Sequence, residues 1–482
     1  MRVLFAIPEN KSMFGDVKSP PPHPHVGIAY LMAVLKKNKI KTAVFDEGIE
    51  EKKEALFKLI DNFKPAVIGV TGFSYAYGFL EELIKKIKKY TSAPLIVGGP
   101  HVSATGKEIL RVTPADFGLA GEGEIAFLEF LKQIEKKKPE FGKVPGLIWK
   151  KGKKILKNPL PGFINDLNKL PFPDYQSFKL EKYPCYLEKS LPIITSRGCP
   201  YNCNYCSVRL SMGRAFRPRS PGNVAAEIRH WSKKGFTSFD INDDCFTLDI
   251  QRAEKICDLI VKNKFKIRLQ LYNGIRADRV TPKLLGKLKK AGCAFIAYGC
   301  ESGNQETLKR IKKNLTLSQV RKAVDWTNQA GIKSAVNFII GHEGETYQQA
   351  LDSLSFAKSL PTNFVNFYNL VPYPGTEVYE WAIKNAKFLV NKKTFLKEIS
   401  YRDNTPIFET KEFTKEQRQE IMKKGFALYE KKILRFRLGP ILGGLVYVFT
   451  RVAFLSKLAR WLVYSNRCGM KAYQLLAAHS KK

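Results

Sequence analysis

The sequence predicts an α/β protein with two successive parallel-sheet units and a helical extension. Three observations predict this class. Short apolar strands alternate with amphipathic helical segments along most of the chain, which is the pattern of parallel sheets covered by helices. A Pro- and Lys-rich stretch interrupts this alternation, and charged helical sequence follows the last strand. We therefore predict four parts, over residues 1–145, 146–184 (a linker with short strands), 185–385 and 386–482.

The first part predicts a doubly wound parallel sheet, because its strands are nearly continuous apolar runs. These strands are Val3–Ile7, Thr42–Phe45, Ala66–Val70, Leu95–Val97 and Phe117–Leu119. Ligands of such sheets bind beyond the carboxyl ends of the strands, where glycine lets a ligand approach the backbone closely. The candidate ligand contacts at these ends are Ser74, Gly98, Gly99, Gly121 and Glu122. Ordinary turn glycines are an equally good interpretation of any one segment.

The third part, residues 185–385, alternates in the same way and predicts six β/α units. Its strands are Ile193–Ser196, Ser238–Ile241, Arg268–Tyr272, Phe295–Gly299, Ala335–Ile340 and Val365–Leu370. Six such units indicate a partial (β/α)6 barrel, with its chemistry at the carboxyl ends of the strands.

The charge of the chain is strongly positive. Lys and Arg number 81 against 44 acidic residues, a formal net charge of +37. Such a charge attracts a nucleic acid, an acidic membrane surface or an anionic cofactor, although solvated Lys faces explain it equally well. No run of 18 apolar residues indicates a transmembrane helix, and the first apolar run is too short for a signal peptide. We expect a cytoplasmic protein whose nine cysteines are reduced.

Three of these cysteines, Cys199, Cys203 and Cys206, follow the first strand of the predicted barrel with the spacing C-x3-C-x2-C. Three thiolates on one loop can hold three irons of a 4Fe–4S cluster and leave the fourth iron open. The alternative is a zinc site, which would need a fourth ligand nearby, but no His lies between His101 and His230. The other cysteines are scattered and predict buried free thiols.

This cysteine motif after a barrel strand resembles the radical S-adenosylmethionine (SAM) family. The resemblance implies a 4Fe–4S cluster that binds SAM and cleaves it to a 5′-deoxyadenosyl radical with an electron from a ferredoxin- or flavodoxin-type donor. It also implies SAM contacts at the later strand ends, although surface ion pairs are the alternative for each charged residue. These SAM candidates are Asp243, Asp244, Arg276, Glu301, Ser302, Gly341 and Pro372.

The first part resembles the Rossmann-like cobalamin-binding domain that precedes many radical SAM barrels. The segments that carry this resemblance are Pro20–Leu31, Ile96–His101 and Gly121–Glu124. It implies cobalamin as a cofactor, contacted by Ser74, Gly98, Gly99, Gly121 and Glu122. Many cobalamin proteins carry D-x-H-x-x-G after the first strand, but residues 9–16 contain no His. We therefore expect no His ligand to cobalt from this loop and treat His23 and His25 as loop residues; a degenerate domain without corrin is the alternative.

The carboxyl-terminal tail is basic and amphipathic. Residues 431–482 contain eleven Lys or Arg and no acidic residue, and apolar residues recur at 445, 448, 452, 455, 459 and 462. This pattern favours peripheral contact with an anionic membrane surface. A terminal helix packed on the barrel is an equal alternative. A nucleic-acid partner is disfavoured because charge is its only support.

Together the two resemblances imply a cobalamin-dependent radical SAM enzyme that methylates an unactivated carbon. One SAM would supply the methyl group and a second would give the radical. The substrate is an unknown small molecule, and the tail makes a lipid attractive. Three alternatives stay open: oxidation, rearrangement or ring closure without methyl transfer; an RNA-binding modification protein; and a non-catalytic cobalamin or redox sensor.

Overall fold

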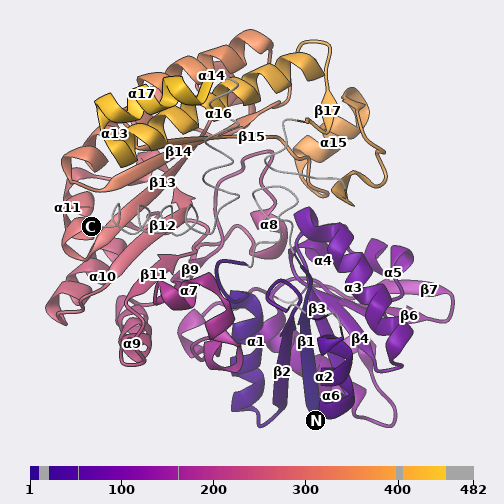
Figure 1. The fold of residues 1–482 in the computed structure, drawn as a ribbon. Coiled ribbons are helices and arrows are strands. Elements are labelled where there is room, and N and C mark those ends of the chain that lie inside the picture. Colours follow the sequence, from indigo (N-terminus) through magenta and orange to yellow (C-terminus); the bar gives the residue numbers. More distant parts are fainter. Residues whose placement is uncertain (10–20, 51, 53, 161, 398–404, 452–482) are drawn as a thin grey trace.

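The computed structural model describes residues 1–9, 21–50, 52, 54–160, 162–397 and 405–451. Two parallel sheets form the bulk of this part of the chain, one above the other in Figure 1. The predicted α/β class is therefore confirmed, with helices on both faces of the first sheet and a helical extension after the second.

The first sheet has seven strands in the order β2-β1-β3-β4-β5-β6-β7, and β1 to β5 are parallel. These five are β1 (Arg2–Ile7), β2 (Lys41–Asp46), β3 (Val67–Thr71), β4 (Leu95–Gly98) and β5 (Phe117–Leu119). Alternate residues of β1 face opposite layers: Phe5 packs toward α1 (Val26–Lys37) and α6 (Gly123–Ile134), while Leu4 packs toward the other face. The helices of that other face are α2 (Ala55–Phe63), α3 (Tyr77–Tyr90), α4 (Pro100–Thr105) and α5 (Glu108–Val112).

The segment predicted as a linker contains two strands that extend this first sheet. β6 (Leu147–Lys151) pairs antiparallel with β5, and β7 (Lys154–Lys157) pairs antiparallel with β6. Beyond them, short turns lead to α7 (Pro184–Leu187). Tyr175 in these turns is buried and donates a hydrogen bond from its hydroxyl to the carbonyl of Pro192, at 2.7 Å. The segment thus packs against the second sheet as well as the first.

The second sheet has six parallel strands in the order β8-β11-β12-β13-β14-β15. They are β8 (Ser190–Ile193), β11 (Ser238–Ile241), β12 (Arg268–Ile275), β13 (Cys293–Glu301), β14 (Lys333–Ile340) and β15 (Phe364–Asn369). The first strand ends at Ile193, and Ser196–Arg197 forms a separate strand, β9, that pairs antiparallel with β10 (Arg217–Pro218). β8 and β15 are the two edges, so the sheet is the predicted partial barrel.

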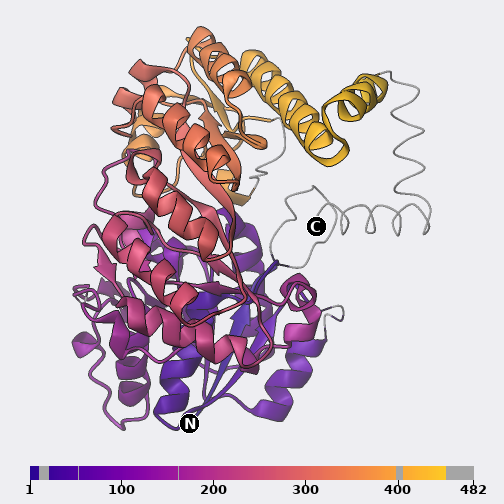
Figure 2. The ribbon, with the colours of Figure 1, turned by 90° about the vertical axis from the view of Figure 1, so that its left-hand side faces the viewer.

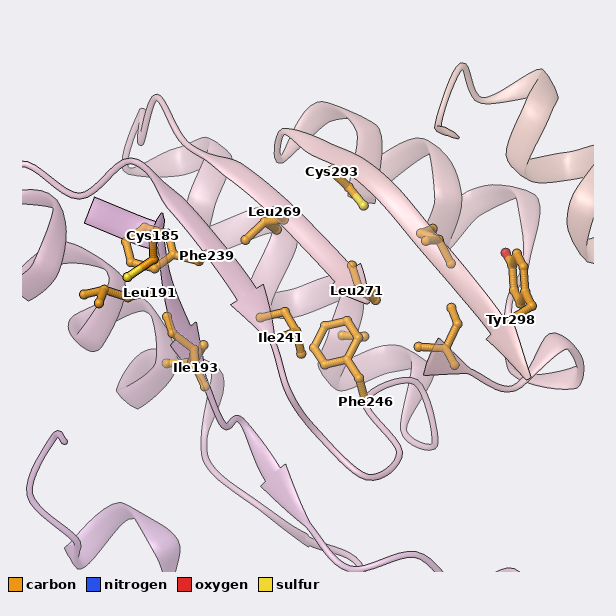
Figure 3. Close-up of a cluster of buried hydrophobic side chains, with 14 of the residues drawn as sticks. Cys185, Leu191, Ile193, Phe239, Ile241, Phe246, Leu269, Leu271, Cys293 and Tyr298 are labelled. Atoms are coloured by element: carbon orange, nitrogen blue, oxygen red, sulfur yellow. The ribbon is translucent and has the colours of Figure 1, made fainter. Parts of the chain in front are cut away.

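One face of this sheet is an apolar core covered by helices. Figure 3 shows part of it, with Leu191 and Ile193 on β8, Phe239 and Ile241 on β11, and Leu269 and Leu271 on β12. The covering helices are α9 (Pro221–Ser232), α10 (Ile250–Lys262), α11 (Pro282–Lys290), α13 (Leu317–Gln329) and α14 (Tyr347–Ser359). Cys185, Cys245, Cys257, Cys293 and Cys300 are buried free thiols, as predicted.

The extension begins with α15 (Glu377–Asn385) and the short pair β16 (Lys387–Phe388) and β17 (Phe408–Glu409). α16 (Lys415–Leu438) lies along β15, and α17 (Pro440–Arg451) folds back on α16, at the end of the molecule away from the first sheet (Figure 2). Ile441, Leu445 and Val448 of α17 are exposed. The rest of the predicted stripe lies outside the described residues, and none of the helices within them is long and apolar enough to cross a membrane.

Candidate functional site

The three cysteines lie on a loop that backbone hydrogen bonds hold in place. The amide of Cys199 donates to the carbonyl of Gly213 at 3.3 Å, and that of Cys206 donates to Cys203 at 3.2 Å. Gly198 donates to the Asp244 carboxylate at 2.8 Å. The loop runs from β9 to the short helix α8 (Val208–Ser211), which contacts α4. Helix α4 covers the first sheet, and we call this sheet with its helices the first domain and the second sheet with its helices the second domain. Because the backbone is fixed, the three partly buried thiols are preorganised for a ligand.

The thiols differ in their surroundings. A hydrogen bond from the buried Cys245 lowers the pKa of Cys199 to about 7, whereas burial raises the pKa of Cys206 to about 11. Among the described residues, no three His, Cys, Asp or Glu side chains are arranged to hold one metal ion. A 4Fe–4S cluster takes one thiolate per iron, so its ligands need not meet at one point, and three cysteines on one loop fit it.

The two aspartates after β11 brace this loop. Asp243 is buried and accepts hydrogen bonds from the Thr195 amide at 2.5 Å, the Thr195 hydroxyl at 2.5 Å and the Ser196 hydroxyl at 2.6 Å. Asp244 accepts from Gly198, and burial raises its pKa to about 6. The structure therefore brings both candidates to the cysteine loop, where Asp243 is fully engaged within the protein.

Arg276 and Glu301 also lie beside the loop. The Arg276 guanidinium lies over the Tyr201 ring, 3.6 Å from its centre, and donates to Asp278 at 2.9 Å and to two backbone carbonyls. Glu301 accepts a hydrogen bond from Lys313 at 2.9 Å and has a positive φ of 74°. Both residues have protein partners, so their roles as SAM contacts stay predictions.

The remaining SAM candidates shape the later strand ends. Ser302 is fully buried, with its hydroxyl 3.2 Å from that of Ser353. Gly341 has a φ of 96°, and a Cβ there would lie 2.2 Å from a guanidinium nitrogen of Arg418. Pro372 is buried just after β15. Packing within the protein thus accounts for a small polar residue at position 302 and for a glycine at position 341.

A cavity of about 240 Å³ opens at the carboxyl ends of β1, β3, β4 and β5. Apolar side chains line much of it, including Phe5, Leu31, Ile96, Leu119 and Phe127. Glycines line much of the rest: Gly27, Gly69, Gly98, Gly99, Gly121 and Gly123. Because these glycines leave the backbone bare, a flat ligand can approach it closely, and the chemistry of this lining fits part of a corrin cofactor.

Four of the five predicted cobalamin contacts line this cavity: Gly98, Gly99, Gly121 and Glu122. Gly99 has a φ of 97°, and a Cβ there would lie 2.7 Å from the Thr71 hydroxyl. Ser74 is not among the lining residues; it is buried with its hydroxyl 3.1 Å from Nδ1 of His101.

His25 lines the cavity, although the sequence indicated only a loop residue. Its Nδ1 accepts a hydrogen bond from the Ile28 amide at 3.3 Å and so caps α1, and its ring stacks on Phe73 with centres 5.5 Å apart. Burial lowers its pKa to about 4, so the ring is neutral. Of residues 9–16, only Glu9 is described.

The second domain contributes part of the cavity wall. Ile194 and Arg197 precede the cysteine loop, Ser211 and Met212 follow it, and all four line the cavity. Arg197 pairs with Glu122 and Glu124 of the first domain, contacts that sequence reasoning missed because no periodicity pairs residues so far apart. The cavity and the cysteine loop are therefore neighbours.

Comparison with known proteins agrees with this two-part site. The model of the radical SAM superfamily matches residues 193–357, and that of the B12 binding domain matches residues 16–131. An uncharacterized methyltransferase from Pyrococcus horikoshii is 29% identical over 432 residues, covering 88% of this chain and 92% of the relative. The anaerobic magnesium-protoporphyrin IX monomethyl ester cyclase of Rubrivivax gelatinosus is 24% identical over 391 residues, covering 79% and 70%.

A solved structure shares the whole fold. The cobalamin-dependent SAM radical enzyme OxsB, with aqua-cobalamin and SAM bound, superposes with a TM-score of 0.73 at 18% identity, covering 99% of this chain and 75% of OxsB. The B12-binding part precedes the radical SAM part in the chain, as the two matched ranges show. The chain is a B12-binding radical SAM protein, related to the cobalamin-dependent radical SAM methyltransferases.

Proposed function

We propose that this radical SAM enzyme transfers a methyl group to an unactivated carbon of a small molecule, with cobalamin as the methyl carrier. The observation that carries the proposal is the shared wall, in which Ile194, Arg197, Ser211 and Met212 flank the cysteine loop and line the glycine cavity. A radical source and a methyl carrier must act on one substrate atom, so they have to lie close together. This neighbourhood of the two sites supplies that proximity.

The roles of the chain's own residues follow from the site. Cys199, Cys203 and Cys206 would hold the cluster, and the glycines and apolar side chains of the cavity would hold the corrin. When bound, the cluster supplies one-electron cleavage of SAM and cobalamin supplies methyl transfer. The net change at the substrate would be replacement of one C–H hydrogen by a SAM-derived methyl group, and the residues of the shared wall would hold that carbon between the two cofactor sites. The apolar side chains that line the cavity would keep water away from the reacting carbon.

The methyl assignment draws support from the Pyrococcus horikoshii relative, which is named a methyltransferase and aligns with 88% of this chain. The Rubrivivax gelatinosus relative supports a second candidate, ring closure without methyl transfer, at lower identity and coverage. Only methyl transfer adds the SAM methyl group to the product, so the fate of that methyl group distinguishes the two reactions.

The test is anaerobic reconstitution with iron, sulfide and cobalamin, followed by incubation with a cell extract and SAM labelled in its methyl group. We expect the protein to bind iron and corrin, to form 5′-deoxyadenosine under reductant, and to place the label in a new product. Formation of 5′-deoxyadenosine with an unlabelled product would favour ring closure. Absence of both corrin binding and SAM cleavage would refute the proposal.

Two variants and one control sharpen the cluster assignment. Cys203→Ala should lose the cluster and SAM cleavage together, while Cys257→Ala, which removes a buried thiol outside the loop, should keep both. Cys245→Ala tests the open iron, because Cys245 is the thiol that contacts Cys199. Cluster content and SAM cleavage should survive this change; their loss, with Cys257→Ala unaffected, would indicate a fourth protein ligand.

A further inference from the structure

A buried cluster of four charged residues joins the first domain to the second. Arg197 on β9 donates to Glu122 at 2.8 Å and to Glu124 at 2.6 Å, and Arg217 on β10 donates to Glu122 at 2.7 Å. All four side chains are at most 6% exposed. We call this set the Glu–Arg bridge.

Each end of the Glu–Arg bridge belongs to one of the two cofactor sites. Glu122 and Glu124 lie at the start of α6 and line the glycine cavity. Arg197 is two residues before Cys199, and only Gly198 stands between them. Gly198 cannot absorb a displacement freely, because its amide is bonded to Asp244 and a Cβ on it would lie 2.2 Å from the Ala215 carbonyl oxygen.

Arg217 ties the other end of the cysteine loop to the same carboxylate. Its guanidinium donates to the carbonyl of Met212 at 2.8 Å and to that of Ile164 at 2.9 Å. Met212 follows the cysteine loop and lines the cavity. Glu122 therefore meets, through two arginines, the backbone both before and after the three cysteines.

We infer that the Glu–Arg bridge is a positioning device, which sets the distance and orientation of the cluster relative to the corrin. Apolar packing at this boundary would leave the two domains free to slide, whereas forked guanidinium–carboxylate pairs fix direction as well as distance. A buried ion pair adds little net stability over apolar packing, so geometric specificity is a better reason for it here. The inference rests on both cofactors binding as proposed, but not on methyl transfer.

The test measures geometry directly and needs no substrate. In the reconstituted full-length protein, the reduced cluster and cob(II)alamin are both paramagnetic, and pulsed EPR reports the magnetic coupling between them. Glu124→Gln removes one charge of the Glu–Arg bridge, and Arg197→Lys keeps the charge but loses the fork. Glu227→Gln is the matched control, since it removes a fully buried carboxylate that is paired with Arg219 and lies outside the Glu–Arg bridge.

We expect Glu124→Gln and Arg197→Lys to retain iron and corrin but to show a broadened, shifted coupling, while Glu227→Gln matches the wild type. Wild-type coupling in both bridge variants would overturn the inference. Loss of corrin with iron intact would also overturn it, because the carboxylates would then be cofactor contacts. A wild-type protein that binds no corrin would instead refute the proposed function, and this inference with it.

Discussion

Gly198→Ala should destabilise the protein and empty the cluster site. Gly198 has a φ of 83°, a left-handed conformation that costs a residue with a side chain about 1–2 kcal/mol. The added Cβ would lie 2.2 Å from the Ala215 carbonyl oxygen and 3.2 Å from that of Met212. Backbone oxygens cannot rotate away as side chains do, so the loop must shift, at about 1–3 kcal/mol for a typical overpacked site. The sum is about 2–5 kcal/mol, a large part of the stability of a typical domain.

Two other glycines separate these costs. Gly235 has a φ of 90°, and an added Cβ there would meet nothing within 4 Å, so Gly235→Ala should cost only the backbone part, about 1–2 kcal/mol. Gly222 lies in the first turn of α9, also with nothing within 4 Å, and Gly222→Ala should be neutral or slightly stabilising.

Urea unfolding of the three variants gives the free energies, and iron content with the visible absorption of the cluster gives occupancy. Gly198→Ala should lose more stability than Gly235→Ala and should alone lose iron. Equal destabilisation of these two variants, with full iron in both, would show that the contact with Ala215 does not hold the cysteine loop.

Three further perturbations test other parts of the molecule. Glu345 is buried, and burial raises its pKa to about 7, so the fold disfavours the ionised carboxylate. Relative to Glu345→Gln, the wild type should lose up to about 3 kcal/mol of unfolding free energy as the pH rises from near 4.5 through 7. Urea midpoints measure this difference, and a difference that does not change with pH would contradict the prediction. His25→Gln should keep corrin and leave the cob(II)alamin EPR spectrum unchanged, because Nδ1 of His25 accepts the Ile28 amide proton and the neutral ring then carries its own proton on Nε2. Loss of a nitrogen splitting in the variant would identify His25 as a cobalt ligand. Leu445→Asp should weaken co-sedimentation with anionic vesicles, because Leu445 is 54% exposed on the apolar stripe of α17. Tyr447→Phe, on the side facing Lys431 of α16, serves as the control. Equal vesicle binding by the two variants would argue that the stripe does not contact lipid.

The sequence predicted the two sheets and the cysteine loop because these depend on local patterns. Apolar runs such as Val3–Ile7 have one physical interpretation, burial on both faces, and three closely spaced cysteines define a loop by themselves. The prediction of the first barrel strand was less accurate, because it continued to Ser196 whereas β8 ends at Ile193. Ser196 and Arg197 instead form a separate strand that pairs with β10. No local signal distinguishes the two, because the choice depends on a partner twenty residues later.

Residue roles were harder to predict than residue positions. Asp243 and Arg276 were expected to contact SAM. Both lie beside the cysteine loop, where they also bond to Thr195, Ser196, Asp278 and backbone carbonyls, and their contact with SAM stays a prediction. A charged residue at a strand end gives the same sequence pattern whether it binds a ligand or braces a loop. Ser74 and the Glu–Arg bridge illustrate the same limit, because their partners come from distant segments.

The helix that lies along β15 has a consequence for solubility. β15 is an edge of the second sheet, and Gly425 of α16 is so close to it that a Cβ there would lie 2.6 Å from the Phe367 ring. Without α16, this edge strand would be more accessible to another extended chain. The carboxyl-terminal extension thus covers this edge strand. We expect a protein shortened before residue 415 to self-associate through it.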